Sequence, residues 1–134
     1  MGAIQRILAN DVACYHVARD FRRETAERLL FSTIEPSVVP GDDMSNQRIR
    51  EAIVSLHQRL LGQNLVADDP EIERTFQLFT GIIADANAQG PFEPRETYFC
   101  GGREEFRTED PLYTIRAWRG VVTYLLRQHS FLYE

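Results

Sequence analysis

Two cysteines and three histidines in this sequence could together form a nucleophilic catalytic site. Cys100 stands in the stretch 96-ETYFCGGREEF-106, directly before two glycines and a run of charged residues. A catalytic cysteine needs a base, usually histidine, within hydrogen-bond reach. His16, His57 and His129 are available, but their spacing matches no catalytic signature. We therefore predict no catalytic residue, and an enzyme with a Cys100/His nucleophilic site is the alternative hypothesis.

Cys14 gives Cys100 a second candidate role, as half of a disulfide. A bond between the two would close a loop of about 86 residues and would stabilise the fold by about 4 to 5 kcal/mol in the chain-entropy model. It would require an oxidising compartment and would anchor an otherwise irregular segment. Two unpaired buried thiols in a cytosolic protein are the other interpretation, since free cysteine is often buried.

The sequence contains no recognisable metal or cofactor motif. It has no CxxC or HxxxH pair, and it lacks the CxxCH motif that attaches haem. His16 and Asp20 are four residues apart and would share a helix face, but one such pair is more typical of a hydrogen bond than of a metal site. We therefore predict neither a metal nor a cofactor.

Arginines near both ends of the chain could bind an anion. They are Arg19, Arg22, Arg23, Arg116, Arg119 and Arg127. The simpler interpretation is a solvated helix face with intrahelical ion pairs, such as Arg23 with Glu27. A ligand bound between the helices is a third hypothesis.

Length and composition indicate one globular domain covering residues 1–134. The chain has 134 residues, of which 43% are hydrophobic. Its apolar runs are only a few residues long, so we predict no membrane span. The net charge of -5 argues against a nucleic-acid partner, because binding phosphates requires a basic surface.

Hydrophobic periodicity predicts four principal helices. The first runs from about residue 3 to 31, because the apolar stripe that ends at Phe21 resumes at Ala26, Leu29 and Leu30. The second begins near Ser45 as its N-cap and ends at Gly62.

Two Asp-Pro pairs mark the starts of the remaining helices. Asp69-Pro70 begins the third helix, which Gly90-Pro91 ends, and Asp110-Pro111 begins the fourth. The prediction is an all-α, bundle-like domain with one long irregular loop.

That loop runs from Pro91 to Asp110 and shows no sustained periodicity, although residues 97–100 could form a short strand. Long irregular loops are often functional. We therefore predict that it contacts a protein partner, through Tyr98, Arg103, Phe106 and Arg107.

Two stretches resemble regions of known proteins. They are 48-RIREAIVSLHQRLLGQNLVADDPEIERTFQLF-79 and 113-YTIRAWRGVVTYLLRQHSFLYE-134. Both are similar to domains of unknown function in large secreted or surface proteins of planctomycetes and myxobacteria, which often occur beside c-type cytochrome modules. The resemblance covers about half of the chain and rests on helical patterns.

The resemblance implies a periplasmic or cell-surface location, and it favours the Cys14–Cys100 bond. It also implies that the chain is a fragment of a longer protein, whose electron-transfer chemistry would belong to a neighbouring domain. We expect a non-catalytic interaction or structural module whose partner is a cytochrome-containing neighbour or a second copy. A cytoplasmic helical regulator is the other alternative.

Overall fold

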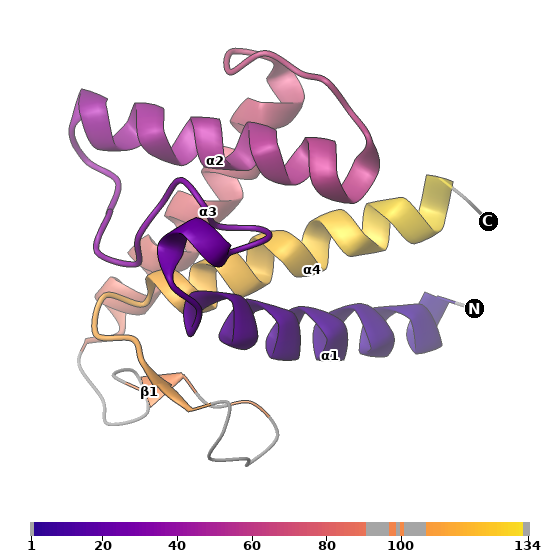
Figure 1. Cartoon of the computed structure of the whole chain (residues 1–134), viewed down its shortest axis with the longest axis horizontal. Helices are drawn as coiled ribbons and strands as arrows, with labels where there is room; N and C mark the ends of the chain where they lie inside the picture. The colour runs from indigo at the N-terminus through magenta and orange to yellow at the C-terminus, as the bar shows by residue number, and fades with distance from the viewer. Residues whose placement is uncertain (1, 91–96, 99, 101–106, 133–134) are drawn as a thin grey trace.

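The computed structural model describes residues 2–90, 97, 98, 100 and 107–132, and side chains within residues 8–128 of that part. Four helices and a two-stranded antiparallel sheet make up its regular structure, with a single 3-10 turn between the first two helices (Figure 1). The elements are α1 (Gly2–Phe21), η1 (Thr25–Glu27), α2 (Asp43–Leu61), α3 (Pro70–Ala88), β1 (Thr97–Tyr98), β2 (Thr108–Glu109) and α4 (Thr114–Leu132). The predicted all-α, bundle-like fold is confirmed.

The four helices surround one aromatic-centred core. α1 and α4 run antiparallel, side by side, and pack more extensively than any other pair of elements, while α3 and α2 cover α4 from the other side (Figure 1). Trp118 of α4 is fully buried at the centre. Its ring centroid lies 4.3 Å from that of Phe79 and 5.4 Å from that of Phe31. α1, the loop after it and α3 therefore meet on α4.

Local capping chemistry sets the ends of α2 and α3. Gly62 ends α2 in the left-handed region at φ 68°, and the Asp69 carboxylate accepts the Glu71 N–H at 2.9 Å ahead of Pro70, as predicted. The predicted N-cap of α2 was wrong by three residues. Asp42 is the cap, and its carboxylate accepts the Ser45 N–H at 2.8 Å.

The first helix ends at Phe21, so its predicted extension to residue 31 was wrong. The Asp20 carboxylate accepts backbone N–H groups of Leu29, Leu30 and Phe31 at 2.8 to 3.0 Å. A helix through these residues would need the same N–H groups for its own carbonyls. Their capture by a side chain turns the chain back along α1 and places Phe31 in the core.

The fourth helix begins later than Asp110-Pro111. Asp110 still caps it, because its carboxylate accepts the N–H groups of Ile115 at 2.9 Å and Arg116 at 3.1 Å. Between cap and helix, Tyr113 adopts a left-handed conformation at φ 63°, which inserts a turn.

A short hairpin joins α3 to α4. β1 pairs with β2 in register, with Thr97 opposite Glu109 and Tyr98 opposite Thr108. The predicted strand at residues 97–100 is confirmed for its first two residues, and Phe99 lies outside the described part.

Two glycines provide a matched test of these helix boundaries. Gly62→Ala forces a side chain into the left-handed region and should lower the free energy of unfolding by about 1 kcal/mol. Gly81→Ala lies within α3, where an added Cβ meets nothing within 4 Å, and should raise it by roughly 0.5 to 1 kcal/mol. Urea denaturation followed by circular dichroism measures both. Equal effects of the two substitutions would contradict the assigned C-cap.

Candidate functional site

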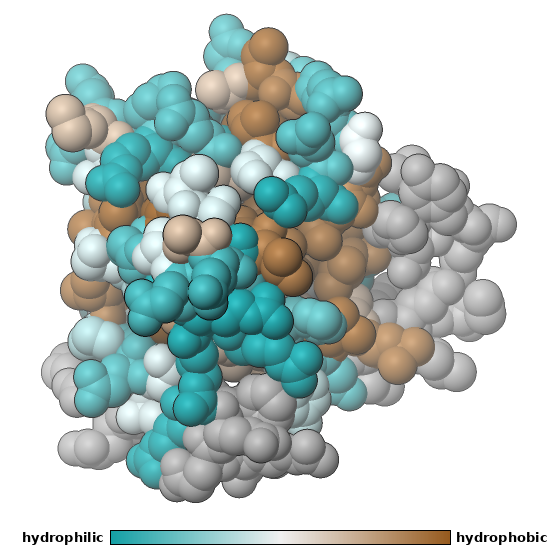
Figure 2. All heavy atoms as spheres, viewed as in Figure 1, coloured by the Kyte–Doolittle hydropathy of each residue, from teal (hydrophilic) through white to brown (hydrophobic). Residues whose placement is uncertain are grey.

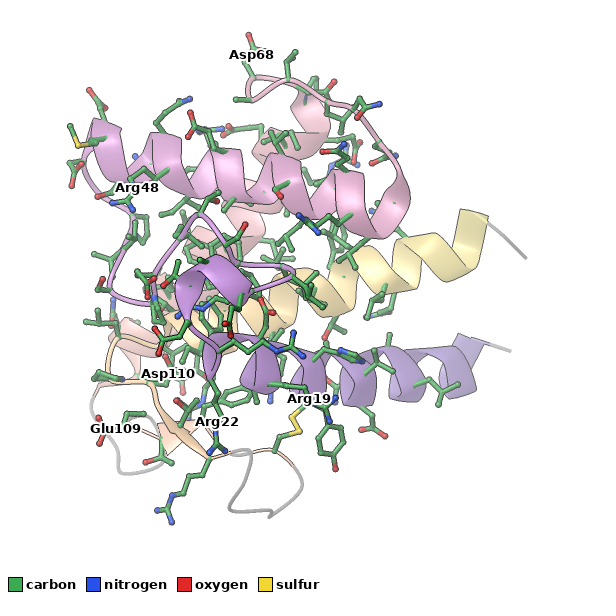
Figure 3. All side chains as sticks on the ribbon, viewed as in Figure 1. Arg19, Arg22, Arg48, Asp68, Glu109 and Asp110 are labelled. Atoms are coloured by element: carbon green, nitrogen blue, oxygen red, sulfur yellow. A yellow bond between two sulfur atoms is a disulfide. The ribbon has the colours of Figure 1, made fainter. Side chains whose placement is uncertain are left out.

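A disulfide joins α1 to the hairpin. Cys14 and Cys100 are bonded, with their Cα atoms 5.8 Å apart, and Cys100 is almost completely buried. Figure 3 shows the bond between α1 and the chain that follows β1. Both cysteines are in the disulfide, so neither has a free thiol in this state. A bonded Cys100 cannot act as a nucleophile, because the attacking species is the thiolate.

Polar contacts reinforce the disulfide at the base of the hairpin. The Tyr98 hydroxyl donates to the carbonyl oxygen of Cys14 at 2.8 Å, beside the disulfide. Burial raises the pKa of Tyr98 to about 12, so the phenol keeps its proton at neutral pH. Arg116 of α4 donates to the Thr97 carbonyl and forms an ion pair with Asp110, with its Nη1 atom 3.1 Å from Oδ2.

Asp110 is a buried carboxylate held from two sides. It caps α4 and pairs with Arg116, and its own side chain is fully buried. Burial raises the pKa of Asp110 above its usual value, although the backbone N–H bonds and Arg116 oppose this shift. Such a buried, fully bonded pair positions the hairpin on α4.

The four residues predicted to contact a partner have different surroundings. Tyr98 is fully buried, because its ring packs into the core and its hydroxyl is bonded to α1, so it supports the loop rather than facing a partner. Arg107 is exposed next to β2. Arg103 and Phe106 lie outside the described residues.

The histidines that could have assisted Cys100 have other roles where they are described. His57 is fully buried, with Nδ1 2.9 Å from Gln63 Oε1 and Nε2 3.0 Å from Thr75 Oγ1. The Thr75 hydroxyl also donates to the Glu71 carbonyl at 3.0 Å. His57 therefore ties α2 to α3. The side chain of His129 lies outside the described part.

His16 lines a surface pocket of about 240 Å³ between α1, α4, the end of α2 and the segment after α1. Aliphatic side chains form most of its surface, and charged or polar residues of α1 and the next segment form the rest. The apolar residues are Val12, Leu29, Leu30, Leu60, Val122 and Leu126, and the others are His16, Arg19, Asp20 and Arg23. His16 and Asp20, which the sequence places four residues apart on one helix, thus both line this pocket.

The face drawn in Figure 2 also shows hydrophobic residues beside hydrophilic ones. Hydrophobic residues gather to the right of centre, over the α1 and α4 ribbons of Figure 1, and border hydrophilic residues near the middle. Leu8, Val12 and Leu29 are 42 to 58% exposed, which makes them three of the described large hydrophobic residues that remain at the surface. An apolar surface of this kind, bordered by charge, is typical of a binding site.

The wall formed by Leu29 and Leu30 is held by two buried charges. Asp20 binds the backbone of Leu29, Leu30 and Phe31 and has an ion pair with Arg23, whose Nη1 atom lies 3.5 Å from Oδ1. Arg28 is also buried. It reaches both carboxylate oxygens of Glu35 and donates to the Ile34 carbonyl at 3.1 Å. The observed ion pairs replace the intrahelical ones predicted, such as Arg23 with Glu27.

Sequence reasoning identified the basic rim of this pocket but missed its apolar half. Arg19 and Arg23 were candidates as neighbours on one helix, whereas Leu60 and Val122 come from distant helices. Within the described residues, no three His, Cys, Asp or Glu side chains gather in a way that could hold a metal ion. In the same part of the chain, every helix is too short or too polar to cross a bilayer.

Comparisons with protein-family models, with curated proteins and with solved structures found no match for this chain. The resemblance proposed for residues 48–79 and 113–134 therefore stays a prediction. The function has to be argued from the site itself.

Asp20 can be tested as the support of the pocket wall. Asp20→Asn leaves one carbonyl oxygen and an NH₂ group facing three N–H donors, so we expect the free energy of unfolding to fall by about 1 to 3 kcal/mol. Asp11→Asn, on an exposed part of the same helix, should change it by less than about 0.5 kcal/mol. Urea denaturation measures both. A neutral Asp20→Asn would show that the turn does not depend on this carboxylate.

Glu35 should make the stability depend on acid pH. Its bond from the Thr25 hydroxyl, followed by Arg28, lowers its pKa below 4.5, although partial burial opposes this. A carboxylate with a lowered pKa adds stability above its unfolded pKa and loses it as pH falls. Stability should therefore decline below about pH 4.5, and less steeply in Glu35→Gln.

Thermal melts between pH 3 and 6 measure this difference, and Glu24→Gln, at an exposed position, is the matched control. Parallel pH profiles for Glu35→Gln and the unaltered protein would contradict the assigned role.

Proposed function

We propose that this chain is a non-catalytic binding module of an extracytoplasmic assembly, in which the hairpin region presents a contact surface to another protein. The observation that supports this most is the covalent and polar anchoring of the hairpin to α1 and α4. The disulfide, the Tyr98–Cys14 hydrogen bond and Arg116 all act on residues that lie within a few positions of the sequence 101–106.

Such anchoring favours recognition because it removes the freedom that a binding loop otherwise loses on association. Each ordered side chain or loop segment costs free energy when it is immobilised, and a loop whose two ends are already fixed loses less. Charged and aromatic residues occupy this stretch in Arg103, Phe106 and Arg107, and such residues are common in interaction hot spots.

The bonded state of the cysteines supports an oxidising compartment. Disulfides persist in secreted, periplasmic and surface proteins and are rare in the reducing cytosol. A Cys100/His enzyme or a cytoplasmic helical regulator would instead keep free thiols. The partner is a neighbouring protein, which the resemblance suggests could carry cytochrome modules, or a second copy of the chain.

Site-specific photo-crosslinking in the cells that encode the protein tests this proposal. A photoreactive phenylalanine analogue replaces Phe106 in one variant and Met44 in the control, since Met44 is 76% exposed at the start of α2. We expect a discrete crosslinked product, found outside the cytoplasm, from position 106 and none of that mass from position 44. Mass spectrometry of the product distinguishes a cytochrome-containing neighbour from a second copy.

The same crosslink should weaken in a Cys14→Ser/Cys100→Ser variant, because the hairpin then loses its covalent anchor. Alkylation provides the redox control: denatured but unreduced protein should take up no label, and reduced protein two. Identical products from positions 106 and 44, or free thiols in the protein taken from cells, would overturn the proposal.

A further inference from the structure

The pocket beside α1 has an apolar interior whose size limits its ligand. Six aliphatic side chains line it, and its lining residues include no Phe, Tyr or Trp. Its volume of about 240 Å³ is slightly below the roughly 300 to 1,000 Å³ of pockets for drug-sized ligands. At about 30 Å³ for each water-sized group, it holds roughly eight such groups. A slender alkyl chain fits this space, whereas a two-chain lipid does not.

The polar side of the pocket has a positive charge, although the chain as a whole has a charge of -5. Arg19 and Arg23 contribute two guanidinium groups, His16 lies on α1 with Arg19, and Asp20 is the acidic residue in the lining. The Asp20 carboxylate is already bound to three backbone N–H groups and to Arg23, and it is only 3% exposed. It therefore contributes little surface to a ligand.

A guanidinium group favours a carboxylate, because its planar N–H groups match the two oxygens. Arg19 already has an interaction within the chain, and Arg23 is paired with Asp20. Neither needs to be free, since each guanidinium carries five N–H donors. Figure 3 shows Arg19 on α1, at the end of the helix that also holds the disulfide.

We propose that this pocket binds a medium-chain aliphatic carboxylate, with the alkyl chain between Leu29, Leu30, Val122 and Leu126 and the carboxylate beside Arg19 and Arg23. The exposed fractions of Leu29 and Val12, 58% and 42%, are apolar surface that a bound chain would cover. Binding here goes beyond the proposed hairpin function and does not depend on it, because the two sites use different residues.

Isothermal titration calorimetry with sodium octanoate tests the inference, with octylammonium chloride and 1-octanol as probes of equal chain length. We expect saturable octanoate binding with a Kd at least tenfold lower than that of octylammonium. From butanoate to octanoate, each added methylene should tighten binding about threefold to fourfold. Titrations of ¹⁵N-labelled protein should shift the amide signals of α1 and of residues 28–31.

Paired variants locate the binding site. Arg19→Gln/Arg23→Gln should weaken octanoate binding at least tenfold, whereas Arg48→Gln/Arg74→Gln removes the same charge elsewhere and should change it less than twofold. Arg48 lies on α2, well away from Arg19 (Figure 3). Leu29→Ser alters an exposed wall residue and should weaken binding without lowering the melting temperature by more than a few degrees.

Three results would overturn the inference. They are the absence of saturable octanoate binding, equal affinity for octylammonium, and equal effects of the two arginine pairs in variants whose circular dichroism spectra match that of the unaltered protein. The crosslinking experiment does not bear on any of them, so the two proposals can fail separately.

Discussion

The Asp20 carboxylate determines how the first third of the chain is arranged. It ends α1 by binding three backbone N–H groups that a longer helix would have used. Because of this turn, Phe31 reaches the core and stacks on Phe21, with ring centroids 4.3 Å apart, and also contacts Trp118. The same turn leaves Leu29 and Leu30 on the opposite side, as a wall of the pocket. One buried charge therefore separates the side of this segment that packs in the core from the side that lines the pocket.

Buried charges also hold two segments of the described chain that are not helical. Arg28 and Glu35 fix the segment after α1, and Asp110 with Arg116 fixes the entry to α4. In each case the ion pair also satisfies backbone groups, which a buried pair needs if it is not to destabilise the fold. Irregular chain in a small domain cannot satisfy its backbone by itself, and these side chains supply the missing partners.

The sequence was informative where structure depends on neighbouring residues. Gly62 as a C-cap and Asp69-Pro70 as a helix start follow from local chemistry, and both were predicted correctly. The end of α1 was missed because Ala26, Leu29 and Leu30 continue the apolar stripe, and only the folded chain shows that Asp20 reaches their backbone. Asp42 was passed over as the cap of α2 because Ser45, also a good cap, stands nearby.

The candidate site also divides into features that the sequence predicted and features that depend on the folded chain. Cys14 and Cys100 could be named as partners because they are the chain's two cysteines, and the basic residues of the pocket are close together in sequence. Its apolar lining could not be foreseen, because Leu60, Val122 and Leu126 meet Val12 only after three helices have packed. Tyr98 was assigned to a contact surface, since an aromatic residue in an irregular segment gives no sign that its hydroxyl reaches the backbone of α1.

The disulfide also has a mechanical consequence. The start of α1 and the end of α4 lie side by side at one end of the molecule, so tension applied to them would peel the two helices apart from that end (Figure 1). Peeling of α1 would stop at Cys14, because the bond to Cys100 removes a sequence separation of 86 residues from the extensible path. At about 3.4 Å per residue, roughly 290 Å of contour length is withheld. Under load, residues 14–100 would stay together as one cross-linked unit, and α4, which lies outside this loop, would be the longer of the two segments that can still be drawn out.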